Sequence, residues 1–185
     1  IITDNAGTEL LMDLALVDFM LSKDLATQIV LHLKPQPFFV SDAMPRDVEL
    51  GLEALARGGD AARGLGVRLR VFLEKQRLEL RSHWFYATNL FYFQLPKDLK
   101  ADLASMALVI LKGDVNYRRL LGDAHWPSTT PFEYPTAYFP AAFLALRTLK
   151  AELIVGLRAG EAEQLEAQDP DWLVNGRRGL IQGRI

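Results

Sequence analysis

Residues 108–121 read LVILKGDVNYRRLL, and this stretch decides the fold class. The apolar run at 108–111 is short and aliphatic, which is typical of a buried strand. Lys112, Gly113 and Asp114 then turn the chain, and residues 116–121 resume with a helical pattern. A buried strand that turns directly into a helix is the repeating unit of α/β proteins.

The same alternation of short apolar runs and helical patterns extends outward in both directions from this stretch. Strands are predicted at 1–2, 28–33, 38–40 and 143–149, and helices at 7–22, 45–57, 60–74, from 97 onward, and at 161–167. Within 60–74 the alternating apolar residues at 67–73 would also fit a strand, and we favour the helix. We therefore expect an α/β fold, a Rossmann-like three-layer sandwich with a mainly parallel sheet and helices on both faces.

The length of 185 residues, with 50% hydrophobic residues, suits one domain with one good core. We expect the core at residues 1–158 and a peripheral C-terminal segment of the same domain at 159–185, where glycines interrupt a polar sequence. The chain begins abruptly at Ile1, so we also expect it to be the C-terminal part of a longer protein.

Composition excludes several functional classes. Twenty-one basic and 23 acidic residues give a net charge of −2, so no global positive field favours nucleic acid. The absence of cysteine excludes thiolate metal sites and disulfides. The apolar runs are far shorter than the roughly 20 residues that cross a bilayer. We expect a soluble, cytoplasmic protein without nucleic-acid or membrane partners, and the oligomeric state stays open.

Acidic and amide side chains follow three of the predicted strands. Asp4 and Asn5 follow residues 1–2, Asp42 follows 38–40, and Asp114 with Asn116 follows 108–111. The ends of parallel strands share one edge of a sheet, where ligands bind. Hard oxygen donors gathered there suit Mg²⁺ or Mn²⁺. The alternative for any single aspartate is a helix cap.

Cations lie close to the same strand ends. Lys112 and Arg118 flank the strand at 108–111, while Arg147 and Lys150 end the strand at 143–149. Such side chains offset the charge of a phosphoryl group, and Gly113 would allow the backbone to approach a ligand. A lone Lys or Arg is more often a solvated surface residue.

Four motifs, in order, resemble the damage-control phosphatases, in the branch also called sugar-phosphate phosphatase or acidic-residue methyltransferase-like. They are ITDNAGTEL at 2–10, FVSD at 39–42, KGDVNYR at 112–118 and RTLKAE at 147–152. The resemblance covers nearly the whole chain, although members of the branch also carry a helical N-terminal region.

The resemblance implies a role for each matched residue. Asp4, Asn5 and Asp42 would hold a divalent metal, Mn²⁺ or Mg²⁺, with Co²⁺ or Ni²⁺ as alternatives. Arg147 would support the site or bind phosphate. Substrate contacts would come from Asp4, Asn5, Asp114, Val115, Asn116, Tyr117, Arg118 and Lys150.

The activity that the resemblance implies is hydrolysis of small phosphorylated metabolites such as fructose 1-phosphate and fructose 6-phosphate. Either water attacks the phosphorus directly, which we favour, or Asp4 first forms an aspartyl phosphate. The alternatives are an S-adenosylmethionine-dependent protein carboxyl methyltransferase, for which no glycine-rich cofactor loop is evident, and a non-catalytic binding fragment.

Two further patterns have structural interpretations. His32, His83 and His125 are scattered without metal-ligand spacing, so a zinc site is not expected. Residues 123–139 form a proline-rich loop whose aromatic side chains either close over a sugar or hold the loop against the core.

Overall fold

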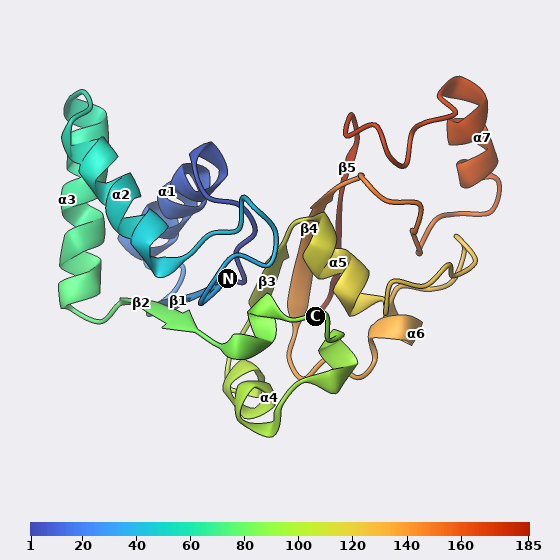
Figure 1. Ribbon diagram of the computed structural model, residues 1–185, viewed down its shortest axis with the longest axis horizontal. Helices are drawn as coiled ribbons and strands as arrows, with labels where there is room; N and C mark the ends of the chain where they lie inside the picture. The colour runs from blue at the N-terminus through green and yellow to red at the C-terminus, as the bar shows by residue number, and fades with distance from the viewer. The chain divides into compact units, whose positions relative to one another are not determined.

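The computed structural model describes residues 1–185 and shows an α/β protein whose chain divides into two compact units. Unit 1 comprises Ile1–Thr88 and unit 2 comprises Asn89–Ile185. Helices and strands alternate along the chain, which confirms the predicted α/β class (Figure 1). The three-layer sandwich and the boundary at residue 158 remain predictions.

Unit 1 is built on two parallel strands, β1 (Ile29–Leu33) and β2 (Leu78–Ser82). The N-terminal segment adds an isolated parallel bridge from Ile2 to His32 of β1. All five residues of β1 are buried, as expected for a strand covered on both faces. Strand β1 was predicted from the sequence but β2 was not, because its sequence LELRS is short and contains only two apolar residues.

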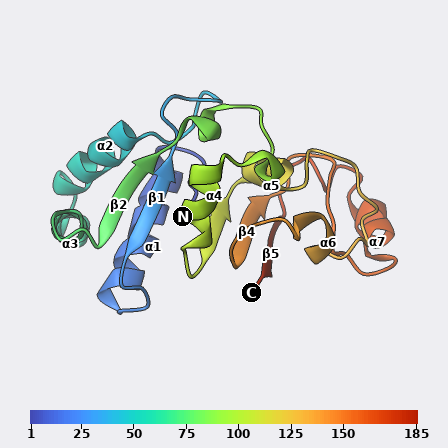
Figure 2. The same cartoon turned by 90° about the horizontal axis from the view of Figure 1, so that it is seen from below.

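Three helices pack against one face of β1 and β2: α1 (Thr8–Ser22), α2 (Pro45–Ala56) and α3 (Asp60–Glu74) (Figures 1 and 2). Successive strand residues point to opposite faces, so Ile29, Leu31 and Leu33 face the helices together. Their buried partners from the helices are Leu10, Leu14, Val17, Leu21, Val48, Leu52 and Leu69. This core fixes the start of α1, where Asp4 and Asn5 precede the helix.

The predicted strand at 38–40 is wrong. These residues lie in bends and turns, Val40 is fully exposed, and Phe39 is half exposed. The N–H groups of Phe38 and Phe39 donate to the Asp42 side chain, so the segment forms a closed turn and not a strand. The chain pairs with another segment just after these residues, where Asp42 forms an antiparallel bridge to Asn5.

Unit 2 contains a three-stranded sheet in the order β3 (Val109–Lys112), β4 (Phe143–Thr148) and β5 (Gly179–Arg184). The pair β3 and β4 is parallel, as predicted, whereas β5 runs antiparallel to β4. Gly183 allows this pairing, because a Cβ there would lie 2.7 Å from the backbone oxygen of Phe143. Helix α5 (Asp114–Leu120) follows β3 directly.

Aromatic side chains form the centre of unit 2. Phe143 of β4 packs against Phe132 and Phe139, and Phe132 stacks on Tyr117 of α5. Phe132 and Phe139 are buried, so these two rings hold the 123–139 loop against the core and do not form a lid. The remaining elements of this unit's first half are the 3₁₀ helix η2 (Tyr92–Gln94), α4 (Lys97–Ala104) and the one-turn helix α6 (Glu133–Thr136). Unit 1 ends with a 3₁₀ helix of its own, η1 (Trp84–Ala87).

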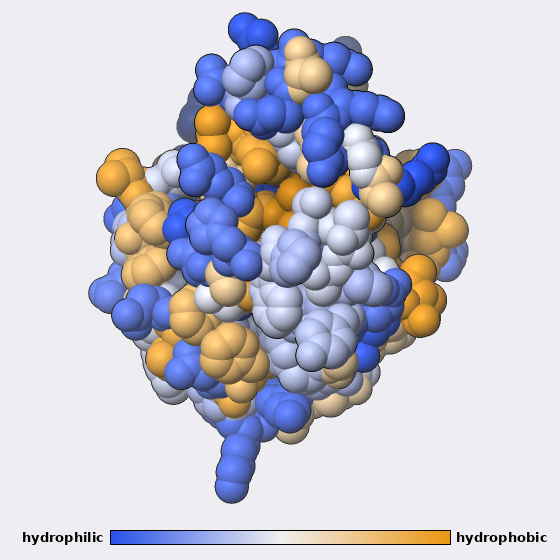
Figure 3. Space-filling view, turned by 90° about the vertical axis from the view of Figure 1, so that its right-hand side faces the viewer, coloured by the Kyte–Doolittle hydropathy of each residue, from blue (hydrophilic) through white to orange (hydrophobic).

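The C-terminal segment carries α7 (Glu161–Gln168), and its Trp172 packs with Leu149 and Ile154 in a small core. Figure 3 shows the side of the molecule that lies on the right in Figure 1. Hydrophilic side chains cover the part that projects at the top of this view, and apolar side chains line the recess beneath it. The prediction of α7 is confirmed, but the sequence analysis missed β5. Among the helices, none combines the length and apolar character needed to cross a membrane.

Candidate active site

Asp4 and Asn5 lie at a strand-to-helix corner of unit 1. Thr3 is held to β1 because its N–H and its Oγ1 both donate to the carbonyl of His32, at 3.1 and 2.9 Å. The chain leaves the strand at Asp4 and enters α1 after Gly7, whose φ of 69° suits glycine. The two candidate residues are therefore anchored by β1 on one side and by α1 on the other.

The Asn5 amide joins two carboxylates. Its Nδ2 donates to Asp4 Oδ2 at 2.9 Å and to Glu9 Oε2 at 3.0 Å. Its Oδ1 accepts a hydrogen bond from Ser41 Oγ at 2.5 Å. These contacts fix which end of the amide is nitrogen and which is oxygen, and the Oδ1 that could bind a cation is the end in contact with Ser41.

Asp42 lies beside Asn5 because residues 41–43 run along residues 4–6. The Ala6 N–H donates to Ser41 O at 2.8 Å, and the Ala43 N–H donates to Asp4 O at 2.9 Å. The Asp42 carboxylate is buried, and its Oδ1 accepts a hydrogen bond from Lys34 Nζ at 2.6 Å. Asp4, Asn5 and Asp42 thus come from two backbone segments, residues 4–6 and 41–43, that are hydrogen-bonded to each other.

Asp42 Oδ2 is also engaged, by the N–H groups of Phe38 and Phe39 at 2.8 and 2.6 Å. A carboxylate offers about four acceptor positions, and three of them are used here. The remaining position lies on Oδ1, the oxygen that Lys34 also holds. Asp42 can therefore give a cation one further contact, at the oxygen that Lys34 also holds.

Asp4, Asn5 and Asp42 fit a hard divalent cation by donor type, since carboxylate and amide oxygens are what Mg²⁺ and Mn²⁺ prefer. No group of three or more His, Cys, Asp or Glu side chains is placed to hold a metal ion. A site on these residues therefore depends on the amide oxygen of Asn5 and on the last acceptor position of Asp42.

The second set of candidate residues lies in unit 2, where Asp114 begins α5 directly after β3. Gly113 precedes it with a φ of 94°, a conformation that other residues rarely adopt. Asp114 Oδ1 accepts from Arg147 Nε at 2.6 Å, and the Lys150 N–H lies 3.4 Å from the same oxygen. Asp114 thus ties the start of α5 to the end of β4.

The guanidinium of Arg147 is hydrogen-bonded to other groups of the protein. Besides the bond to Asp114, it donates to the carbonyls of Leu153 and Ala151 at 2.6 and 2.9 Å. It also lies 4.4 Å over the ring of Tyr117, and its side chain has no exposed surface. These contacts make Arg147 a support for Asp114. Lys150, by contrast, is exposed.

The other predicted substrate residues, Val115, Asn116, Tyr117 and Arg118, lie on α5. Asn116 is buried, with its Nδ2 donating to Lys112 O and its Oδ1 accepting from Tyr92 OH, both at 2.8 Å. Arg118 forms a bidentate pair with Asp123 at 2.7 and 2.8 Å, which lowers the pKa of Asp123. Both side chains already have partners in the protein.

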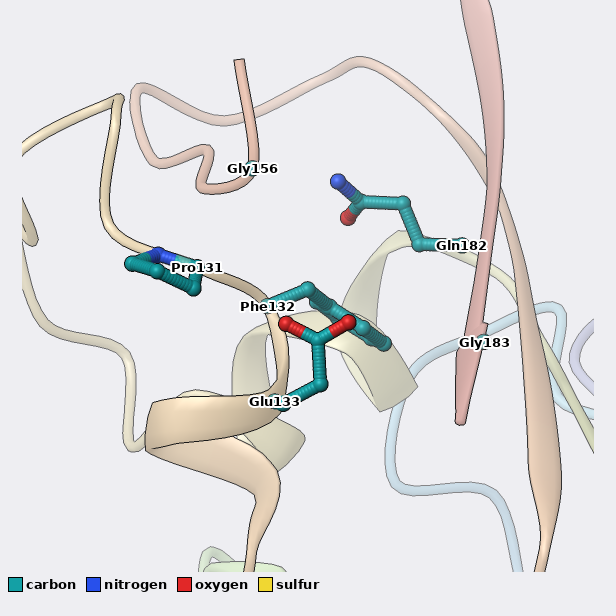
Figure 4. A pocket seen from close by; sticks show the side chains of 6 residues that line it. All are labelled: Pro131, Phe132, Glu133, Gly156, Gln182 and Gly183. Carbon is teal, nitrogen blue, oxygen red and sulfur yellow. The ribbon is translucent and has the colours of Figure 1, made fainter. Parts of the chain in front are cut away.

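Tyr117 faces away from solvent. Burial raises the pKa of Tyr117 to about 12, against the opposing influence of the Arg147 guanidinium. Its hydroxyl donates to Gln182 Oε1 at 2.7 Å. Gln182 forms part of the wall of a pocket of about 290 Å³ in unit 2, where its amide lies across from Glu133 (Figure 4). None of the predicted site residues lines this pocket, whose residues are Pro131, Phe132, Glu133, Gly156, Gln182 and Gly183.

Two residues that contact Asn5 and Asp42 in unit 1 were not predicted as site residues. Glu9 contacts Asn5 from the first turn of α1, and Lys34 contacts Asp42 from the end of β1. The sequence does contain a signal for Glu9, because the side chain of a residue four positions after Asn5 can contact Asn5 at the start of a helix. Lys34 had no such signal, since a lysine before Pro35 reads as the end of a strand.

Comparisons with known proteins identify the family of the chain. Residues 1–165 match the family model described as the damage-control phosphatase ARMT1-like domain. The chain is 40% identical to damage-control phosphatase ARMT1 of Mus musculus over 187 residues, 98% of this chain and 43% of that protein. The corresponding protein of Danio rerio is also 40% identical, and that of Homo sapiens is 36% identical, each over 98% of this chain and 42% of the relative.

The chain therefore spans about 43% of the length of the relatives that it matches. The match to the family model, by contrast, covers most of the chain and includes Asp4, Asn5, Asp42, Asp114 and Lys150. On this evidence, the chain belongs to the ARMT1-like domain family of damage-control phosphatases.

Proposed function

We propose that this chain is a metal-dependent phosphatase that hydrolyses small phosphate monoesters, with sugar phosphates such as fructose 1-phosphate and fructose 6-phosphate as substrates. The observation that carries the proposal is the family match over residues 1–165, which includes the hydrogen-bonded set Asp4, Asn5 and Asp42. The relatives that the chain matches are named as phosphatases.

In this proposal Asp4, Asn5 and Asp42 hold a divalent cation, Mn²⁺ or Mg²⁺, with Co²⁺ or Ni²⁺ as alternatives. A cation bound there supplies a Lewis acid that withdraws charge from a phosphoryl oxygen. The chain's own part is to present three oxygen donors in fixed orientations. Asn5 does so because Asp4, Glu9 and Ser41 hold both ends of its amide.

Substrate binding in this proposal belongs to Asp114, Lys150 and the α5 residues. The exposed ammonium of Lys150 offers a mobile cation to a phosphate. Asp114 is held in place by Arg147, so its carboxylate can accept hydrogen bonds from sugar hydroxyl groups without swinging away. Lys150 and Asp114 thereby distinguish phosphate from sugar, the two chemical parts of the substrate.

The substrate proposal is tested by phosphate release from fructose 1-phosphate, fructose 6-phosphate and p-nitrophenyl phosphate with Mn²⁺, using wild type, Lys150→Met and Lys100→Met. Lys100 is an exposed lysine on α4 and provides the matched control. We expect Lys150→Met to raise KM for both sugar phosphates about tenfold, with a smaller effect on kcat. An unchanged KM in Lys150→Met would remove Lys150 from substrate binding.

A further inference from the structure

Lys34 is a buried cation next to Asp42, one of the three candidate metal-binding residues of unit 1. It follows β1 directly, and its N–H donates to Ala43 O at 3.0 Å. Its Nζ lies 2.6 Å from Asp42 Oδ1, and the two side chains are only 3% and 2% exposed. A lysine this deeply buried is rare unless it is paired, and here the pair is complete.

The Asp42 carboxylate connects both ends of the loop at 34–43. Lys34 reaches it from the start of the loop, and the N–H groups of Phe38 and Phe39 reach it from the middle. Because three of about four acceptor positions are filled, a divalent cation can reach Asp42 only at the Oδ1 that Lys34 already holds. Lys34 and a divalent cation must therefore share one oxygen, with like charges close together.

We propose that Lys34 is a positioning residue that holds Asp42 in the cation-free protein and competes with a divalent cation for Asp42 Oδ1. This inference rests on the proposed function, because Asp42 is there a metal-binding residue. Lys34 compensates the buried charge of Asp42 and keeps the loop at 34–43 closed without a metal. Its ammonium also weakens cation binding, because it repels the incoming charge.

When Lys34 is replaced, a bound divalent cation takes over the compensation of the buried Asp42 charge. In Lys34→Met, Asp42 keeps a buried negative charge without its ammonium partner, which is a costly arrangement. A divalent cation bound at Asp42 then provides the only compensating charge in place of the ammonium. The stability of the variant should therefore depend strongly on the metal, whereas that of the wild type should depend on it weakly.

The test compares thermal unfolding midpoints of wild type, Lys34→Met and the double variant Lys34→Met/Asp42→Asn, each in chelator and in millimolar Mn²⁺. In chelator, Lys34→Met should unfold about 10 °C below wild type. The double variant should recover most of that loss, since an asparagine oxygen can still accept the Phe38 and Phe39 N–H bonds without a charge. Lys75→Met, at an exposed lysine of unit 1, is the matched control and should match wild type.

In Mn²⁺, Lys34→Met should regain most of its midpoint, and a direct titration should show Mn²⁺ binding roughly tenfold tighter than to wild type. The inference is overturned if the double variant is no more stable than Lys34→Met, because Lys34 would then act through packing. It is equally overturned if Mn²⁺ shifts Lys34→Met and wild type by the same amount.

The same experiment separates this inference from the proposed function. If wild type binds no Mn²⁺ in the titration, the metal-binding part of the proposed function fails. If wild type binds Mn²⁺ but the variants show no coupling between Lys34 and the cation, the proposed function stands and only the inference fails. If Lys34→Met is unfolded in chelator, its refolding on addition of Mn²⁺ supports the inference, and its failure to refold contradicts it.

Discussion

At the scale of single residues, the orientation of the Asn5 amide is the property on which cation binding depends most. Only the oxygen of an amide can bind a cation, and a half-turn about the last side-chain bond would present nitrogen in its place. Asp4 and Glu9 accept the two N–H groups of Nδ2 and so prevent that half-turn. Glu9 thus acts on the proposed cation through Asn5.

We predict that Glu9→Ala weakens Mn²⁺ binding by about tenfold, because residues that orient a ligand typically contribute that much. Glu9→Gln should stay within a few-fold of wild type, since its Oε1 can still accept from Asn5. The measurement is a calorimetric titration with Mn²⁺, with Glu53→Ala on the outer surface of α2 as the control. Equal losses in Glu9→Ala and Glu9→Gln would show that the charge of Glu9, and not its hydrogen bond, is what matters.

His32 gives a second residue-scale prediction, on the dependence of stability on pH. Burial lowers the pKa of His32 to about 3, and nearby positive groups including Arg81 add to the effect. The unfolded chain binds a proton near pH 6.5, whereas the folded chain does not. Stability should therefore fall as the pH drops from about 6.5 toward 3, by up to about 1.4 kcal/mol per pH unit from this group.

Urea unfolding between pH 7 and pH 5 measures this effect in wild type, His32→Gln and His125→Gln. His32→Gln should be less stable at pH 7, because the contact of His32 Nδ1 with Tyr86 OH at 3.0 Å is disturbed, but its stability should fall less steeply with pH. His125 is exposed, so its variant should follow wild type. Parallel curves for wild type and His32→Gln would contradict the assignment of the pH dependence to His32.

At the scale of elements, α1 and α3 are joined by a bidentate ion pair. Arg68 of α3 donates from Nε and Nη2 to the two oxygens of Asp18 of α1, both at 2.8 Å. Asp18 is buried, while half of the Arg68 side chain is exposed. The arginine thus solvates a carboxylate that lies among the apolar residues of unit 1.

We predict that Arg68→Met destabilises the protein by about 2 kcal/mol, because it leaves the Asp18 carboxylate buried with little compensation. The control is Arg70→Met, two residues along the same helix, whose guanidinium lies 3.8 Å from Glu49 at the surface and should contribute less than about 0.5 kcal/mol. Chemical denaturation of both variants measures the difference. Equal losses in the two variants would mean that the Asp18 pair is no stronger than a surface contact.

Elements were predictable where periodicity and packing agree. The helices at 8–22 and 45–56 and the strands at 109–112 and 143–148 follow from apolar spacing, whereas the spacing within the helix at 60–74 fits a strand as well as a helix. The sequence analysis missed β2 and β5 because their apolar residues are few and, in β5, glycines lower the strand propensity. Pairing with β1 and β4 makes them strands. Residues 38–40 show the opposite case. They are apolar and were predicted as a strand, but no neighbouring strand pairs with them.

Within the candidate site, the matched motifs predicted which residues matter but not how they are held. Asp4, Asn5 and Asp42 come together in unit 1, and Asp114, Arg147 and Lys150 in unit 2. Lys34 could not be predicted, because its pairing with Asp42 depends on how the loop at 34–43 folds. Hydrophobic patterning carries no information on such polar contacts between distant positions.

At the scale of the whole molecule, the family match runs through both units, from residue 1 to residue 165. Hydrolysis of a phosphate monoester by this chain, dependent on the cation at Asp4, Asn5 and Asp42, is the central claim that follows.

The most direct measurement is phosphate release from fructose 1-phosphate in Mn²⁺, with and without chelator, by wild type, Asp4→Asn and Asp60→Asn. Asp60 is an exposed aspartate at the start of α3 and serves as the control. We predict turnover in wild type and Asp60→Asn that the chelator abolishes, and a loss of about a hundredfold or more in Asp4→Asn. Turnover that persists in chelator, or in Asp4→Asn, would contradict the central claim.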